Sequence, residues 1–284
     1  MSKIGIIVCG NSGIDYLDHP YDIEVFRSIL LIREEEYTDY VDITAKDFYK
    51  RLRSDKSLVA TTAQTATGVM VETIEKMLNK GYEEILIITI SSMLSGTYSG
   101  AVMAANMIDH DHIHVFDSLS VSYPEARMAL DAAEMAAKGN SMSDILMHLE
   151  NIRDHHAIYF SVDTLRYLVK NGRLSGASGF VGGLLKIKPL LMLTKDGRIE
   201  SIEKIRTSSK SLDRVVEKFL EDTEGKDVEA FIIHAEADER VKQVQNQLSK
   251  IKPELGKLTV YPLTPVVGAH AGPGVAALGF IEKT

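Results

Sequence analysis

Apolar positions in the first half of the chain alternate between strand-like runs and helical stripes. The run Glu84–Ile90 is almost continuously apolar, as a parallel strand covered on both faces requires. Further strands are predicted at Ile4–Val8, Leu58–Ala60 and His112–Phe116. Helices are predicted at Phe48–Leu52 (after a Thr44 cap), Thr67–Asn79, Thr97–Ile108, Glu125–Lys138 and Met142–Asp154. This alternation is typical of an α/β layer fold with right-handed crossovers.

The second half has a different pattern, with a hairpin signal at its centre. Asp196-Gly197 joins two predicted strands, Pro189–Thr194 and Ile199–Ile205. The remaining predicted segments are a strand at 157–162, a helical turn at 164–169, a Gly-rich stretch at 172–183, a helix at 212–220, a strand at 228–234, a helix at 238–250, a strand at 258–262 and a C-terminal segment at 266–281. We therefore predict two α/β domains: residues 1–156 with a parallel sheet in three layers, and residues 157–284 with a mixed sheet.

Composition and charge narrow the class of protein. The 284 residues are 45% hydrophobic and 25% charged, which is ordinary for a globular chain, and no apolar run reaches the length of a membrane helix. The net charge of −8 argues against nucleic acid as a partner and allows at most transient membrane contact. Cys9 is the single cysteine, so no internal disulfide can form. We expect a cytoplasmic protein.

Positive charge is concentrated in one stretch, residues 170–214. Ten basic residues and four acidic ones give it a charge of +6, so the rest of the chain has −14. Such a stretch indicates either a site for an anion or acidic partner, or a solvated basic face. Arg173 follows a Gly turn and Arg206 follows a strand, and arginine suits bidentate contacts with phosphate or carboxylate.

The segment Ile90–Tyr98 is the most informative one for chemistry. A buried strand ends, small hydroxyl residues follow, and a helix begins, so unpaired N–H groups and a positive dipole end face this turn. Ser95, Gly96 and Thr97 would hold an anion there, although Ser95 could also be a simple helix cap. A serine-hydrolase elbow is not favoured, because both glycines of Gly-x-Ser-x-Gly are missing.

A second turn of the same type lies at Thr61–Thr65. If both turns follow strands of one parallel sheet, they open on the same edge, where α/β proteins bind ligands. Their hydroxyls could then meet on one carboxylate or phosphate.

Two histidine-containing segments remain. His270 lies among small, flexible residues near the C-terminus and could donate to an anion or act as an acid or base, but a core or surface role is equally open. His110, His112 and His114 are read as surface residues, since a strand places at most two of them near one ion.

Taken in order, these segments resemble the DegV family of fatty-acid-binding proteins. The matching segments are Asn11–Asp15, Phe48-Tyr49-x-x-Leu52, Thr62–Gln64, Ser91–Tyr98, Phe116–Ser118, Tyr167–Ser175, Lys188–Leu190, Gly197–Ile199, Lys204-x-Arg206 and His270-x-Gly272-Pro273-Gly274. They cover essentially the whole chain in the family's order. The chain departs from the usual family pattern at Asn11, Ala63 and Thr65.

The resemblance implies two α/β domains with a long-chain fatty acid buried between them and no cofactor. It implies a non-enzymatic binding subunit that presents the acid to a partner fatty acid kinase for phosphorylation to acyl phosphate. The implied head-group contacts are Thr62, Ser95, Gly96 and His270, with Ser92 and Thr97 as further candidates. Arg173 and Arg206 would lie near the cleft mouth and serve the kinase or the acyl phosphate.

An alternative is an enzyme or kinase subunit acting on a small polar keto or phosphorylated substrate in the cleft. That function requires a small polar cavity, whereas a fatty-acid carrier requires a long apolar one. A DNA-binding regulator is disfavoured by the net charge and the lack of a helix-turn-helix pattern.

Overall fold

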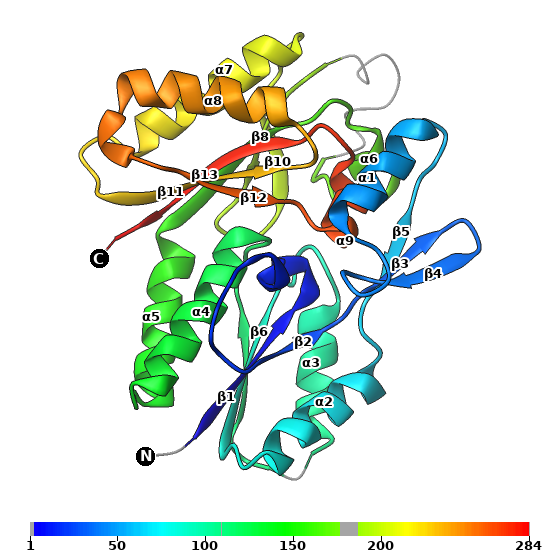
Figure 1. Ribbon diagram of the computed structural model, residues 1–284, viewed down its shortest axis with the longest axis vertical. Helices are drawn as coiled ribbons and strands as arrows, with labels where there is room; N and C mark the ends of the chain where they lie inside the picture. Colours follow the sequence, from blue (N-terminus) through cyan, green and yellow to red (C-terminus); the bar gives the residue numbers. More distant parts are fainter. Residues whose placement is uncertain (1–2, 109, 177–186, 284) are drawn as a thin grey trace.

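The computed structural model describes residues 3–108, 110–176 and 187–283, and it places two principal sheets one above the other (Figure 1). The lower sheet has four parallel strands in the order β2-β1-β6-β7. The upper sheet has six strands in the order β10-β9-β8-β13-β11-β12, with parallel and antiparallel pairs. The predicted fold class is confirmed.

The parallel sheet is the middle layer of three. Its elements are β1 (Ile4–Cys9), β2 (Ile23–Phe26), α2 (Thr67–Asn79), β6 (Glu84–Thr89), α3 (Thr97–Asn106), β7 (Ile113–Asp117), α4 (Tyr123–Ala137) and α5 (Met142–Asp154). Side chains alternate across a strand. Ile7 and Cys9 therefore pack with α2 and α3, whereas Ile6 and Val8 face α4. The two central strands, β1 and β6, are buried along almost their whole length, which explains their nearly continuous apolar runs, whereas the edge strands β2 and β7 are mostly half-buried.

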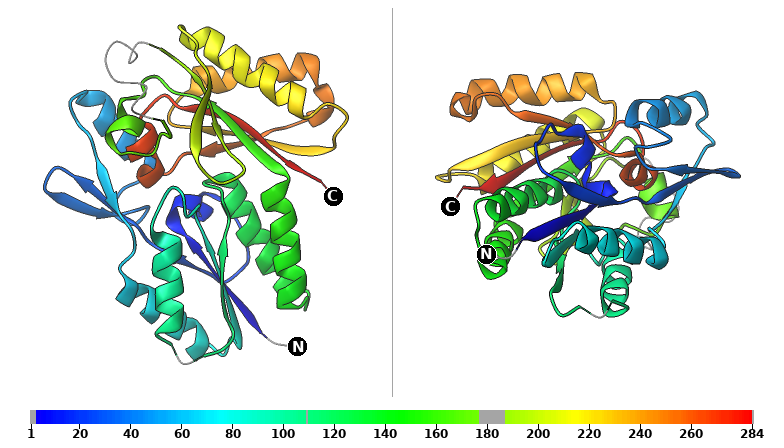
Figure 2. Two further views of the ribbon diagram at one scale, coloured as in Figure 1. Left: turned by 180° about the vertical axis from the view of Figure 1, so that it is seen from behind. Right: turned by 60° about the horizontal axis from the view of Figure 1, so that its bottom comes forward.

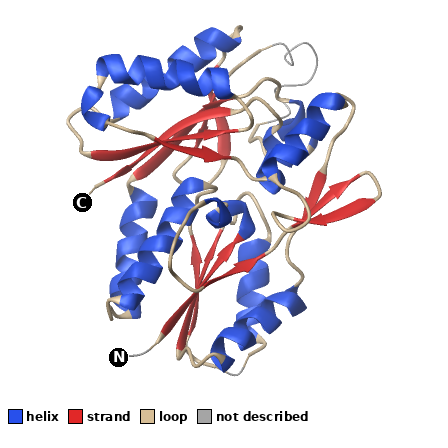
Figure 3. Ribbon diagram, in the orientation of Figure 1, coloured by secondary structure: helices blue, strands red, loops and turns tan. Residues whose placement is uncertain are grey.

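Two long helices cover the outer face of the mixed sheet. Its elements are β8 (His156–Ser161), β9 (Leu190–Leu193), β10 (Ile199–Glu203), α7 (Ser208–Asp222), β11 (Val228–His234), α8 (Asp238–Ile251), β12 (Thr259–Pro262) and β13 (Ala276–Glu282). α7 and α8 lie over the outer face, as Figure 2 shows from other directions and Figure 3 shows with helices and strands coloured separately. The inner face belongs to the same apolar cluster as α4 and the parallel sheet, through residues such as Phe160 and Ile233.

A third, small sheet lies beside both, in the order β4-β3-β5 (Figure 1). It contains β3 (Ile29–Ile32), β4 (Glu35–Thr38) and β5 (Thr61–Ala63), all antiparallel, and it lies near α1 (Ala45–Ser54), α6 (Arg166–Lys170) and α9 (Pro265–Ala271). The strand predicted at Leu58–Ala60 is wrong, because pairing with β3 begins at Thr61. The prediction from the sequence missed β2, β3 and β4, because these short segments have no clear hydrophobic periodicity.

The other predicted elements agree with the structure within a few residues. α2, α5 and β11 have the predicted bounds, and the Thr44 hydroxyl caps α1 by accepting from the Asp47 amide. The hairpin at Asp196-Gly197 is present. The C-terminal segment forms α9 and β13, and residues 177–183 of the Gly-rich stretch lie outside the described residues. The boundary at residue 156 stays a prediction.

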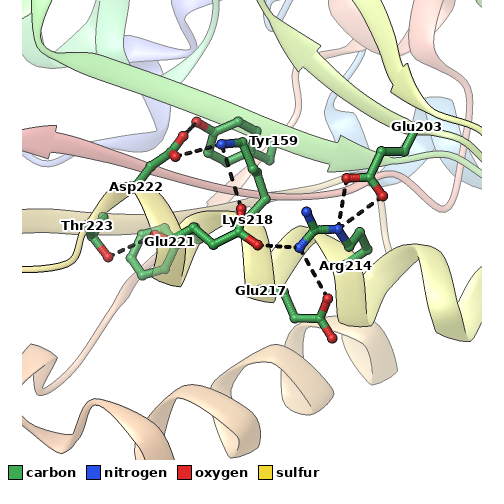
Figure 4. A network of polar contacts seen from close by, with 9 residues as sticks. Tyr159, Glu203, Arg214, Glu217, Lys218, Glu221, Asp222 and Thr223 are labelled. Carbon is green, nitrogen blue, oxygen red and sulfur yellow. Dashed lines mark hydrogen bonds and ion pairs between the residues drawn. The ribbon is translucent and has the colours of Figure 1, made fainter.

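A polar network fixes α7 against the outer face of the mixed sheet (Figure 4). The Arg214 guanidinium contacts Glu203 at 2.8 Å and Glu221 at 2.7 Å, and Lys218 contacts Asp222 at 2.6 Å. The Tyr159 hydroxyl donates to the same aspartate. Arg214 is therefore neutralised within its own neighbourhood, which reduces the free positive charge of the 170–214 stretch.

No helix in the described ranges is both long and apolar enough to span a bilayer.

Close packing between α1 and α9 gives a testable prediction. A Cβ at Gly268 would lie 2.2 Å from the Tyr49 hydroxyl oxygen, and that hydroxyl donates to the Leu263 carbonyl at 2.9 Å. Because Tyr49 is fully buried, it has no free space to move into. We expect Gly268→Ala to lower the free energy of unfolding by about 1–3 kcal/mol, the usual cost of overpacking. Urea unfolding followed by circular dichroism measures this.

Gly68→Ala is the matched control, because a Cβ there meets nothing within 4 Å in the exposed start of α2. It should be neutral or stabilising by about 0.5–1 kcal/mol. Equal effects of the two substitutions would contradict the packing argument.

Candidate ligand-binding site

A cavity of about 630 Å³ lies where the three sheets meet. Its wall includes Thr62, Ala63 and Gln64 from β5 and the following turn, and Ser95 and Thr97 from the turn before α3. The second half of the chain contributes residues from α6, α9 and β10, so both predicted domains line it.

The polar end of this cavity is formed by hydroxyl groups and one imidazole. Thr62 Oγ1 lies 2.8 Å from His270 Nε2, which joins β5 to the last turn of α9. Ser95 Oγ and Thr97 Oγ1 are 2.8 Å apart, and the Thr97 amide donates to Ser95 Oγ at 3.2 Å. These groups can donate hydrogen bonds to a carboxylate or phosphate.

The turn before α3 is built around Ser91. Its carbonyl accepts from the amides of Leu94 at 3.0 Å and Ser95 at 3.2 Å, which folds the chain into a tight turn. Its hydroxyl donates to the Gly197 carbonyl at 2.8 Å, so the same turn is attached to the β9–β10 hairpin. α3 begins directly afterwards at Thr97, with its positive dipole end facing the cavity turn.

The two candidate turns meet, but not for the reason predicted from the sequence. The 61–65 segment belongs to the small antiparallel sheet, so the expectation that both turns follow one parallel sheet is wrong. They meet because the Gln64 side chain lies against α3: a Cβ at Gly96 would be 2.7 Å from its Oε1 atom. Gly96 therefore leaves room for this flexible side chain beside the cavity.

His270 is held in its neutral form. Burial, with a smaller contribution from the positive charge of Arg173, lowers its pKa from the ordinary 6.5 to about 4. Its Nδ1 atom is shielded and has no hydrogen-bond partner among the described residues. A neutral imidazole can donate one hydrogen bond to an anion without placing a full charge in the cavity.

Arg173 lies at the same polar end of the cavity. Its Nε atom donates to the Leu94 carbonyl at 3.3 Å, and another guanidinium nitrogen donates to the Asn171 carbonyl. It lines the cavity and is half-buried. Among the described residues that line this cavity, it is the only one with a permanent charge.

Three predicted site residues lie outside the lining. Ser92 is half-buried, and its amide donates to Asp117 Oδ1 at 3.1 Å. Arg206 is exposed beyond β10, and Gly96 contacts Gln64 from the solvent side. The structure therefore brings together Thr62, Ser95, Thr97, His270 and Arg173.

A second cavity of about 460 Å³ adjoins the first and is almost entirely apolar. The two share Val121, Ile199, Val267 and Ala271, so they are direct neighbours along these side chains. The deeper walls come from the inner face of the mixed sheet, and Ser122 is the polar exception. Sequence reasoning did not find these lining residues, since apolar side chains spread over several elements give no motif.

A fold of one parallel and one mixed sheet, with a cavity that is polar at one end and apolar beyond it, defines a ligand-binding α/β protein. A family model described as "Uncharacterised protein, DegV family" matches residues 3–283, and the chain belongs to this family.

Relatives with curated descriptions or solved structures agree with this assignment. The chain is 36% identical over 265 residues to Protein DegV of Bacillus subtilis, covering 93% of each chain. It is similar to the crystal structure of DegV, a fatty acid binding protein from B. subtilis, with a TM-score of 0.83, 30% identity and full coverage of both chains. A DegV family protein from Thermus thermophilus, described for its fatty acid binding, gives a TM-score of 0.86 at 26% identity, again over both full chains.

The neutral state of His270 gives a prediction about acid stability. Since its pKa is about 4 in the folded protein and 6.5 in the unfolded chain, the unfolded chain takes up the proton first as the pH falls. The contribution of the neutral, buried His270 to the free energy of unfolding is fully present above pH 6.5 and is lost progressively down to about pH 4. We expect the unfolding free energy of ligand-free wild type to fall by up to about 3 kcal/mol more than that of His270→Gln over this range.

Urea unfolding of both proteins at several pH values measures this difference. The variant is needed as a reference because His156, also with a pKa near 4, and Asp39, with a pKa near 7, titrate in the same range. Parallel curves for the two proteins would show that His270 does not titrate as a buried group.

Proposed function

We propose that this protein binds one long-chain fatty acid, with its carboxylate at the polar end of the cavity and its chain in the apolar continuation. The observation that supports this most directly is the cavity itself: hydroxyls and a neutral imidazole at one end, and apolar walls beyond. The fatty acids bound by the related DegV proteins point to the same class of ligand.

The energetics of fatty-acid binding fit a cavity that is polar at one end and apolar beyond it. A sixteen-carbon chain has about 14 methylenes, and each gains ~0.8 kcal/mol on leaving water, so about 11 kcal/mol of gross free energy favours an apolar tunnel. A carboxylate cannot be buried without partners and needs several donors. Thr62, Ser95, Thr97 and His270 offer hydroxyl and imidazole donors, and Arg173 offers a charge.

The alternative ligand, a small polar keto or phosphorylated compound, would not occupy the deeper cavity. Eleven apolar residues and one serine would remain around empty space next to such a ligand. The apolar continuation therefore favours the fatty acid.

We further propose that the protein is not itself an enzyme and presents its fatty acid to a separate, ATP-dependent fatty acid kinase that forms the acyl phosphate. Lys204, Arg206 and Lys210 are exposed beyond β10, and none of them has a carboxylate partner within the described part of the chain. An acidic face of the kinase would dock against this surface, which we call the basic edge. Ser92 would contribute only through the turn that it shares with Ser95.

The first test is native mass spectrometry of protein purified from a bacterial host, followed by organic extraction of the bound molecule. We expect a mass increment of one long-chain fatty acid per chain. If the protein is purified without a ligand and also does not bind added palmitate or oleate, the proposed carrier function is contradicted. The enzyme acting on a small substrate then becomes the hypothesis to test.

Head-group variants test the proposed polar end. His270→Ala and Ser95→Ala each remove a donor to a charged group, worth about 1.5–3 kcal/mol, so fatty acid affinity should fall by roughly ten- to hundredfold. Isothermal titration of the delipidated proteins measures the affinity. Ser99→Ala, an exposed serine of α3, is the control and should bind as wild type does. Unchanged affinity in both cavity variants would count against this head-group site.

The basic edge has a separate test. Arg206→Ala should retain its fatty acid and slow phosphorylation by the cognate kinase several-fold, because a charge in an interface mainly affects association. Lys250→Ala removes an equally exposed charge at the end of α8 and should change neither property. If Arg206→Ala instead loses the fatty acid, the residue acts on the pocket and not on the partner.

A further inference from the structure

A buried pair, Asn11 and Glu125, lies at the wall of the cavity, where Asn11 belongs to the lining and Glu125 lies behind it, and neither is among the proposed head-group residues. Asn11 follows β1 in a short 3₁₀ turn, Gly10–Ser12, and Glu125 lies in the first turn of α4. They are 4% and 0% exposed, and Asn11 Nδ2 lies 2.5 Å from Glu125 Oε2. Burial raises the pKa of Glu125 well above its usual range, so the carboxyl group is uncharged.

Asn11 also lines the cavity that contains the head-group site. Its amide nitrogen, Nδ2, donates to Glu125, which leaves its carbonyl oxygen, Oδ1, as the amide atom available to accept a hydrogen bond. The lining of the cavity therefore includes a buried amide with an acceptor to offer.

A second buried polar side chain, Ser122, lies three residues before Glu125 in the sequence. Ser122 is 1% exposed, its Oγ atom has no hydrogen-bond partner within the described ranges, and the residue lines the deeper cavity. Its φ of 65° is uncommon for a non-glycine residue, so the surrounding structure holds it there. The adjacent Val121 lines both cavities, which puts Ser122 next to their junction.

An acceptor and a hydroxyl in this position do not suit an unsubstituted fatty acid. Its chain offers only C–H groups, and its carboxylate is an acceptor that cannot pair with the Asn11 carbonyl oxygen. A hydroxyl group on the chain could donate to Asn11 and accept from Ser122, and so satisfy both buried groups.

We propose that the cavity is built for fatty acids that have a hydroxyl group along the chain, with Asn11 and Ser122 as its hydrogen-bond partners and Glu125 as the residue that positions Asn11. This inference rests on the proposed fatty-acid binding and names the substrate class within it. The competing explanation is that the buried pair only fastens α4 to the end of β1.

The test compares stearate with a set of positional isomers of hydroxystearate, by isothermal titration of the delipidated wild-type protein. We expect at least one isomer to bind about three- to tenfold more tightly than stearate, the gain from about one satisfied hydrogen bond. If every isomer binds no better than stearate, this inference is overturned while the proposed function stands. If neither stearate nor any isomer binds, the proposed function itself fails.

Two sets of variants separate recognition from a structural role. In the double variant Asn11→Leu with Glu125→Leu, both partners become apolar together, so neither member of the pair is left facing an unpaired polar side chain, and the preference for the hydroxylated acid should vanish. Glu125→Gln keeps an acceptor for Asn11 Nδ2 and should retain the preference. Ser122→Ala should reduce it even if the double variant does not fold. A preference that survives in Ser122→Ala and in a folded double variant would contradict the assignment.

Discussion

The six-stranded mixed sheet has its own helices, α7 and α8, on its outer face, and burial of its inner face organises the rest of the molecule. Residues such as Phe160 and Ile233 point away from α7 and α8, so they must be covered by the N-terminal half. That cover is incomplete: between the inner face, α9 and the turn before α3, two neighbouring cavities remain. The binding site is thus a consequence of how one sheet buries its second face.

The contrast between the two ends of the cavity follows from which parts of the chain supply them. Regular strands of the mixed sheet line the deep end, and their backbone groups are used in the ladder, so only apolar side chains remain. Turns and the end of a short helix line the outer end, where hydroxyls, an imidazole and a guanidinium are available. An amphipathic ligand matches this division better than a polar or a purely apolar one does.

The polar end of the cavity contains little free positive charge. Burial keeps His270 neutral, and Arg173 has its guanidinium partly engaged by backbone carbonyls. The proposed carboxylate would therefore be held mostly by hydrogen bonds, which leaves it open to reaction with a phosphoryl group. Farther along the chain, Arg198 and Arg214 are paired with nearby carboxylates, so the free charge of the basic stretch is confined to a smaller area than the sequence count indicates.

The sequence by itself determined the layers, because continuous apolar runs and 3.6-residue stripes report directly which faces are buried. It also located Thr62, Ser95 and His270, since their flanking motifs survive as a linear pattern. Only the tertiary structure decided that Thr62 belongs to a small antiparallel sheet, that Arg173 enters the cavity and that Ser92 and Arg206 do not line it. Those outcomes depend on contacts between residues distant in the chain, such as Thr62 with His270 and Asn11 with Glu125. No local propensity encodes such contacts, because they arise from the packing of whole sheets and helices against one another.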